Sequence, residues 1–254
     1  MKIPKLKFRK MSLEENIELI KWAYYENDDL FNIHNFTIKY FPELENLDKN
    51  LSKEEINKII ERIVKESYEK HQDKIEKEIQ RYNALWQPYN DLYFRNLSNY
   101  LNISWPNNID IIEGRVGLIP VFPRYLDSFS FSVSTNMNDQ QLIETCAHET
   151  LHFLWFEKWK RTYPGTPREE FESPYITWQY SEMVTDPILN NKPFSDIFDF
   201  KERGYANFYE MYDGETSVMD KLRKIYSTNI SVEEKIKSGF DYITNLLNPK
   251  SKSK

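Results

Sequence analysis

The chain has 254 residues, a formal net charge of −6, an aromatic content of 15% and only 6 glycines. A chain of this length can bury a substantial core, and this composition favours an ordered, helix-rich globule over a disordered chain. Acidic residues outnumber basic ones, and nucleic-acid binding requires a strongly basic surface, so we expect no nucleic-acid partner. The single cysteine, Cys146, excludes an internal disulfide framework.

The first ten residues are basic, but no apolar segment of about seven residues follows them, which argues against a secretory signal. No stretch approaches the ~18 consecutive apolar residues of a membrane-spanning helix. We therefore expect a cytoplasmic protein without a membrane partner.

The N-terminal part of the chain has the pattern of charged helices. Ser12 followed by Glu15, and Ser52 followed by Glu55, match the capping box that begins many helices. The first pair predicts a helix to about residue 27. The second opens a longer helical pattern that continues to residue 82.

Pro88 interrupts this pattern, and a further helix is predicted over residues 89–101. We therefore treat residues 1–104 as a helical N-terminal region. His34 and His71 lie in it, but neither belongs to a spaced group of ligands, so we expect each to be packed or solvated.

A turn cluster at residues 105–108 marks a change of character. Three strand-like runs follow, at residues 109–113, 116–122 and 128–134. Pro120 lies in the middle run and cannot donate a ladder hydrogen bond, so we expect this strand at a sheet edge.

Helices are predicted for most of the remaining chain. Asn138 with Gln141 can cap a helix that continues to about residue 159. Ser173 and Pro174 suit the first positions of another helix. Two more are predicted near residues 214–226 and over residues 231–247. We expect residues 105–250 to form a second region packed as one compact unit, within a helix-rich α+β fold.

The sequence His148-Glu149-Thr150-Leu151-His152 lies in the first of these C-terminal helices. Residues four apart lie one above the other on a helix, so both imidazoles can reach a single zinc ion. Glu149 is positioned to take a proton from a metal-bound water. Cys146 lies only two residues before His148 and does not share its face, so we expect a buried thiol.

A catalytic zinc usually has three protein ligands and one open position. The metzincin pattern would need glycine at position 155 and histidine at position 158, where this chain has Trp155 and Lys158. No histidine follows His152, so a third ligand from downstream must be a carboxylate.

Two carboxylates compete for this role. Glu172 lies twenty positions after His152, a spacing seen in thermolysin-like enzymes, and Glu182 lies thirty positions after it. Glu182 and Asp186 are four apart on a predicted helix and face the same way. Because a zinc-binding histidine usually donates its other ring N–H to a carboxylate, this pairing favours Glu182.

On these residues the chain resembles the gluzincins, the group of metallopeptidases to which thermolysin belongs. The resemblance covers roughly residues 109–190. It implies that His148, His152 and Glu182 bind one zinc ion, that Glu149 is the general base and that Asp186 orients His148.

The resemblance also implies a zincin-like core in which a small mixed sheet lies over the active-site helix, flanked by N- and C-terminal helices. Pro187 departs from the pattern. Because proline disfavours a helical conformation in the residue before it, we expect Asp186 at a kink or helix end.

The chemistry expected of these residues is hydrolysis of a peptide or protein substrate. In zincins the substrate lies extended along an edge strand, which here would be residues 116–120. A donor for the developing oxyanion is also expected, for which Tyr205, Tyr209 and Tyr212 are possible.

Two alternatives stay open. The first is a zincin-like metal-binding protein without peptidase activity, which the intact Glu149 disfavours. The second is a helical interaction protein that holds a structural metal. Structural zinc sites normally close with four protein ligands and favour cysteine, which disfavours this alternative.

Overall fold

The computed structural model describes residues 2–26, 32–199 and 204–247. The chain forms two compact units. One, here called the helical unit, comprises residues 1–4, 89–110 and 146–254. The other, the sheet unit, comprises residues 5–88 and 111–145. Each is described by itself.

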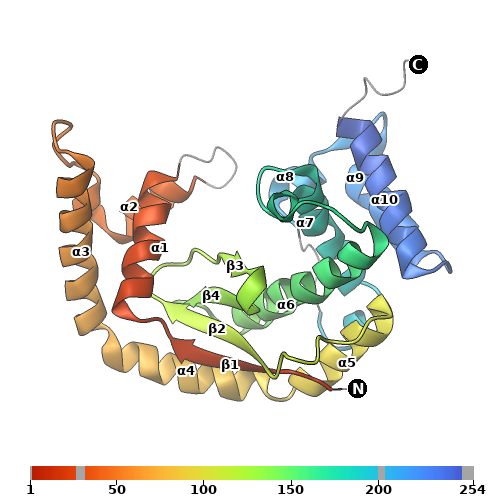
Figure 1. Cartoon of the computed structure of the whole chain (residues 1–254), viewed down its shortest axis with the longest axis horizontal. Coiled ribbons are helices and arrows are strands. Elements are labelled where there is room, and N and C mark those ends of the chain that lie inside the picture. The colour runs from red at the N-terminus through yellow and green to blue at the C-terminus, as the bar shows by residue number, and fades with distance from the viewer. Residues whose placement is uncertain (1, 27–31, 200–203, 248–254) are drawn as a thin grey trace. The chain divides into compact units, whose positions relative to one another are not determined.

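The sheet unit contains a four-stranded mixed sheet with strand order β1-β2-β4-β3 (Figure 1). β1 is parallel to β2, β2 is parallel to β4, and β3 is antiparallel to β4. The strands are β1 (Lys5–Lys10), β2 (Ile111–Gly117), β3 (Arg124–Tyr125) and β4 (Ser130–Ser134).

The prediction of an edge strand at residues 116–122 was wrong. A single strand, β2, covers residues 111–117 and lies in the interior of the sheet, with β1 on one side and β4 on the other. The ladder ends at Leu118, whose backbone N–H donates to the side chain of Asn16 at 3.1 Å. Pro120 therefore lies beyond the strand, and residues 116 and 117 offer no open edge for an extended peptide, because β1 and β4 flank β2.

Helices account for the rest of the sheet unit. Both predicted capping boxes are present: Ser12 caps α1 and Ser52 caps α3, with Glu15 and Glu55 completing the boxes. The long helix predicted to residue 82 is broken at His71, whose backbone ends α3 and begins α4. The helices are α1 (Leu13–Tyr25), α2 (Ile33–Tyr40), α3 (Lys53–Lys70) and α4 (Gln72–Trp86), with a 3₁₀ turn at Pro42–Leu44. The predicted end of the first helix, residue 27, lies outside the described residues.

α4 runs beside β1 and closes this edge of the sheet (Figure 1). The side-chain amide of Asn83 accepts the backbone N–H of Phe8 at 3.1 Å and donates to its carbonyl at 3.3 Å. Tyr82 packs edge-on against the ring of Phe8, and its hydroxyl donates to the carbonyl of Ser134 at 2.6 Å. The side chain of Asn83 thus pairs with the backbone N–H and C=O of Phe8, which would otherwise be unpaired on the edge strand β1.

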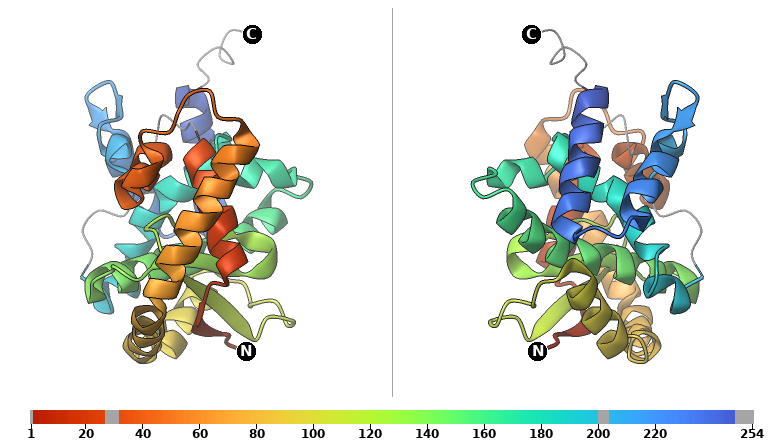
Figure 2. Two further views of the ribbon diagram at one scale, coloured as in Figure 1. Left: turned by 90° about the vertical axis from the view of Figure 1, so that its left-hand side faces the viewer. Right: turned by 90° about the vertical axis from the view of Figure 1, so that its right-hand side faces the viewer.

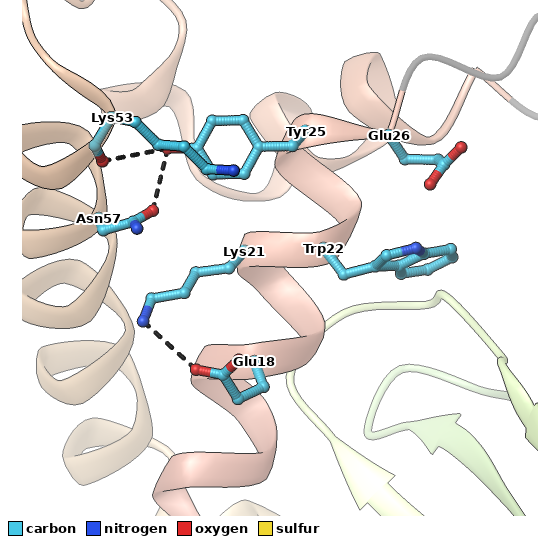
Figure 3. A pocket seen from close by; sticks show the side chains of 7 residues that line it. All are labelled: Glu18, Lys21, Trp22, Tyr25, Glu26, Lys53 and Asn57. Atoms are coloured by element: carbon cyan, nitrogen blue, oxygen red, sulfur yellow. Dashed lines mark hydrogen bonds and ion pairs between the residues drawn. The ribbon is translucent and has the colours of Figure 1, made fainter.

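α1 packs along α3 (Figure 2), and a hollow opens between them (Figure 3). The side chains that line it largely bind one another. Lys21 forms an ion pair with Glu18, and the Tyr25 hydroxyl donates to Asn57. Trp22 points away from α3 and is 44% exposed.

The helical unit carries the His-Glu-x-x-His sequence. The predicted cap of α6 is present: the side chain of Asn138 accepts the N–H of Gln141, whose side chain accepts the N–H of Asn138. The first residues of α6, up to Thr145, are grouped with the sheet unit. The helices are α5 (Asn90–Leu101), α6 (Asp139–Thr162), α7 (Ile176–Leu189), α8 (Ala206–Tyr209), α9 (Val218–Ser227) and α10 (Val232–Leu247). Two 3₁₀ turns (Arg168–Phe171 and Phe194–Asp196) and a small hairpin of β5 (Tyr212–Asp213) and β6 (Thr216–Ser217) complete it.

α7 begins later than predicted. Tyr175, and not Ser173, is its N-cap, and the peptide bond between Ser173 and Pro174 is cis. Pro187 lies inside the helix, which continues to Leu189. Of the two expected positions of Asp186, a kink or a helix end, the helix end was therefore wrong.

An aromatic cluster joins α6, α7 and α10. Trp155 and Trp159 of α6 stack on each other at 5.1 Å, and Tyr180 of α7 packs against both. The Tyr180 hydroxyl lies 2.9 Å from that of Tyr226 on α9. Gly239 of α10 permits this packing, because a Cβ atom there would lie 2.2 Å from the Tyr180 oxygen.

The structure confirms a helix-rich α+β fold with a small mixed sheet. The expected division near residue 104 does not coincide with the two units, because β1 comes from the N-terminal region and pairs with β2 from the region after it. Among the residues that the structure describes, no helix combines the length and apolar character needed to cross a bilayer.

Candidate metal centre

α6 positions the two histidines of the His-Glu-x-x-His sequence. The helix is apolar on most of its faces from Cys146 onward, which is typical of a helix buried within a domain. His152 is fully buried, and the side chain of His148 keeps 19% of its surface exposed. Just before His148, the carbonyl of Ala147 accepts a hydrogen bond from the hydroxyl of Tyr93 on α5 at 2.6 Å, which ties this turn to its neighbour.

Glu182 of α7 completes the group. Its Oε2 lies 3.0 Å from Nε2 of His148 and 3.4 Å from Nε2 of His152. The two Nε2 atoms are 3.0 Å apart. Glu182 is 2% exposed, so its carboxylate faces the histidines and is almost fully withdrawn from solvent.

The three atoms have the spacing of metal ligands. Zinc binds nitrogen and oxygen at about 2.0–2.2 Å with tetrahedral angles, which places neighbouring ligand atoms about 3.4 Å apart. The observed separations of 3.0, 3.0 and 3.4 Å are close to this value. With both rings neutral and protonated on Nδ1, the two Nε2 atoms and the carboxylate would point three lone pairs at one place, an arrangement that needs a proton or a cation. The described residues contain no other such convergence of three or more histidine, cysteine or acidic side chains.

Glu149 follows His148 on α6 and is 8% exposed, but it does not belong to the converging group. Cys146 does not belong to it either. Its thiol is buried, as predicted, and its pKa is raised by burial and by the charge of Glu149. The sequence therefore supplies a carboxylate beside the ligands that is not itself one of them.

Asp186 lies one turn after Glu182 on α7 and is fully buried. Its carboxylate accepts hydrogen bonds from Arg223 Nε at 2.8 Å, Arg223 Nη2 at 3.0 Å and the Tyr209 hydroxyl at 2.6 Å. The pKa of Arg223 is raised, mainly by its hydrogen bonds to Asp186. Sequence reasoning named Asp186 and Tyr209 but missed Arg223. An arginine 37 positions downstream carries no local signal of this contact.

The three candidate oxyanion donors have different surroundings. The proton of Tyr209 is committed to Asp186, while its oxygen accepts the N–H of Gly204 at 3.0 Å. Tyr205, the N-cap of α8, is 37% exposed, and its ring lies 6.4 Å from that of Trp178. Tyr212 lies in the β5–β6 hairpin and is 61% exposed. The prediction that Tyr209 could donate to an oxyanion is therefore disfavoured.

Glu172, the competing third ligand, lies outside the converging group. It ends the 3₁₀ turn before α7, and its carboxylate binds Arg168 at 2.7 Å on the surface. Of the two carboxylates weighed from the sequence, the structure brings Glu182 to the histidines.

Comparisons with protein-family models, with curated proteins and with solved structures found no match to this chain. The function is therefore inferred from the geometry of the site.

Proposed function

We propose that the protein is a zinc-dependent peptidase of the gluzincin type. The observation that supports this most is the convergence of His148, His152 and Glu182 from two helices, with a buried carboxylate, Glu149, directly after His148 in the sequence. Two histidines and one carboxylate form a ligand set found in catalytic zinc sites, where three protein ligands leave one position open. In this proposal α6 and α7 are the two motif helices of a zincin-like core.

Zinc bound to these ligands would supply a Lewis acid and a water of lowered pKa. Glu149 would accept the proton from the attacking water and deliver it to the leaving amine. His148, His152 and Glu182 would hold the site rigid while leaving one side accessible, consistent with the partial exposure of His148.

Two other functions compete with this one. A zincin-like metal-binding protein without peptidase activity would not need Glu149, whose position beside the ligands favours catalysis. A helical interaction protein with a structural metal would normally close its site with four ligands. Among the described residues the group offers three.

The proposal is tested by digestion of a broad peptide library with zinc-loaded protein, with and without a chelator. Glu149→Gln keeps the size and hydrogen-bonding capacity of the side chain but cannot accept a proton. It should retain zinc and lower hydrolysis by about 10²- to 10⁴-fold. Glu157→Gln is a matched control, because Glu157 lies on the same helix but forms an ion pair with Lys160.

Cleavage that depends on metal and on Glu149, but not on Glu157, supports the peptidase. A zinc-loaded wild type that leaves the whole library uncut contradicts it and favours the metal-binding alternative.

A further inference from the structure

Asp186 is the centre of a second polar cluster in the helical unit, joined by α7 to the ligand Glu182. Asp186 is fully buried on α7, Tyr209 is the last residue of α8, and Arg223 lies on α9. Three helices therefore meet at one carboxylate. A carboxylate accepts about four hydrogen bonds, and Arg223 and Tyr209 together supply three.

The hydrogen bonds of this cluster hold the carboxylate of Asp186 in one position, an arrangement here called the Asp186 clamp. Arg223 uses Nε and Nη2 on the two oxygens of Asp186, the bidentate arrangement in which guanidinium and carboxylate hold each other most rigidly. The guanidinium also lies 5.8 Å from the ring centre of Tyr209. A buried carboxylate without such partners would be costly, so this cluster fixes the position of Asp186 strongly.

The backbone of α7 explains why a clamp is needed at this turn. Pro187 has no N–H, so the carbonyl of Met183 lacks its usual helical partner, and the proline ring crowds that carbonyl. The missing hydrogen bond between residues 183 and 187 therefore lies between Glu182 and the end of the helix. Asp186 follows Glu182 by four residues, so both side chains lie on the same face of α7. Contacts that hold Asp186 therefore also hold the orientation of the turn that presents Glu182.

We propose that Arg223 and Tyr209 are positioning residues for the metal centre, acting through Asp186. This inference rests on the proposed metal centre but not on peptidase activity. It extends the orienting role expected of Asp186 to a clamp supplied by α8 and α9, so that the C-terminal helices set how tightly the site binds zinc.

The test is a double-mutant cycle read out as zinc affinity. Arg223→Gln removes the charge and the fork and should weaken zinc binding about tenfold or more, the effect usual for residues that orient ligands. Arg223→Lys keeps the positive charge but cannot donate two parallel hydrogen bonds, so it should recover part of the zinc affinity. Tyr209→Phe should cause a smaller loss of zinc affinity.

Asp220→Asn is the matched control, because Asp220 binds the same guanidinium at 3.2 Å on the exposed side of α9. It should leave zinc binding unchanged.

The decisive comparison is between Asp186→Asn and the double variant Asp186→Asn/Arg223→Gln. If Arg223 acts through Asp186, the double variant binds zinc no more weakly than Asp186→Asn alone. Additive losses, or wild-type affinity in Arg223→Gln, would overturn the proposal.

A spectroscopic readout separates positioning from general loss of structure. In Co²⁺-substituted protein, Arg223→Gln should alter the visible absorption bands, which depend on ligand geometry, and Asp220→Asn should not. If Arg223→Gln does not fold, Arg223→Lys and Tyr209→Phe carry the same test, and wild-type affinity and spectra in both overturn it. A wild type that binds zinc but cuts no peptide contradicts the peptidase alone, while zinc-binding results still decide the role of Arg223.

Discussion

At the scale of single residues, Glu182 brings α7 to the two histidines of α6. Its Oε2 lies within 3.4 Å of both Nε2 atoms, and its side chain is almost completely buried. A carboxylate buried in this way needs a cation or protons to offset the cost of leaving water. The same burial makes Glu182 sensitive to substitutions that keep its shape but remove its charge.

Glu182→Gln should weaken zinc affinity by more than the roughly 10- to 100-fold that is typical of losing a residue that only orients a ligand. Glu172→Gln should change it little, because Glu172 binds Arg168 on the surface. Competition with a chromophoric chelator measures both affinities. The opposite ranking would show that the spacing of Glu172 from His152 was the better guide to the ligand.

Glu15 gives a residue-scale prediction for the sheet unit. Bidentate hydrogen bonds from Arg9, both at 2.7 Å, lower its pKa from an ordinary 4.5 to about 2. A lowered pKa means that the folded protein favours the ionised form. The resulting stability is complete above pH about 4.5 and is lost as the pH falls towards about 2.

Glu15→Gln keeps the capping box but should flatten the fall in unfolding free energy over this pH interval. Glu14→Gln, an exposed neighbour in the same helical turn, is the control. Denaturant unfolding at several pH values measures both. Equal pH dependence in wild type and Glu15→Gln would show that the Arg9 pair does not contribute.

At the scale of elements, the position of α7 relative to α6 depends on the packing of Tyr180. Its ring lies between Trp155 and Trp159 on one side and Phe240 of α10 on another. Its hydroxyl donates to the carbonyl of Ile236 at 3.1 Å. The approach of α10 is possible only because residue 239 has no side chain.

Gly239→Ala should therefore destabilise the protein by about 1–3 kcal/mol, because the new methyl group overlaps the Tyr180 oxygen in a packed core. Tyr180→Phe removes this oxygen, so the double variant should lose less stability than the sum of the two single variants. Thermal and denaturant unfolding measure this. A fully additive result would mean that the helices shift apart without cost.

The sequence predicted most helices because their starts carry local signals. The predicted capping boxes at Ser12 and Ser52 are both present, and Ser231 with Glu234 forms the same pair of hydrogen bonds before α10. The break at His71 has no such signal, since the apolar pattern continues across it. β1 was missed, although Lys5-Leu6-Lys7-Phe8 alternates as a strand does.

The candidate site shows the same division between local and distant information. Glu182 could be chosen from the sequence because its partner Asp186 is four residues away on one helix. Arg223 could not, because its contact with Asp186 depends on how α9 packs on α7. The central position of β2 was also hidden, since it depends on pairing with β1 from more than a hundred residues earlier.

At the scale of the whole molecule, the helical unit is built from three segments of the chain and the sheet unit from two, so neither is one continuous segment. The candidate metal centre and the Asp186 cluster lie within the helical unit. His34 and His71 lie within the sheet unit and outside the converging group, as expected from their isolation in the sequence. The four histidines of the chain are thus divided equally between a candidate site and other surroundings.

The most direct test of the central claim is elemental analysis of protein purified without added metal. The account predicts about one zinc per chain in the wild type and in His71→Ala, because His71 lies outside the converging group and its Nδ1 contacts the carbonyl and hydroxyl oxygens of Ser67, one turn earlier. His152→Ala should lose most of the zinc while keeping its fold by circular dichroism. Undiminished zinc in folded His152→Ala would contradict a metal centre built from His148, His152 and Glu182.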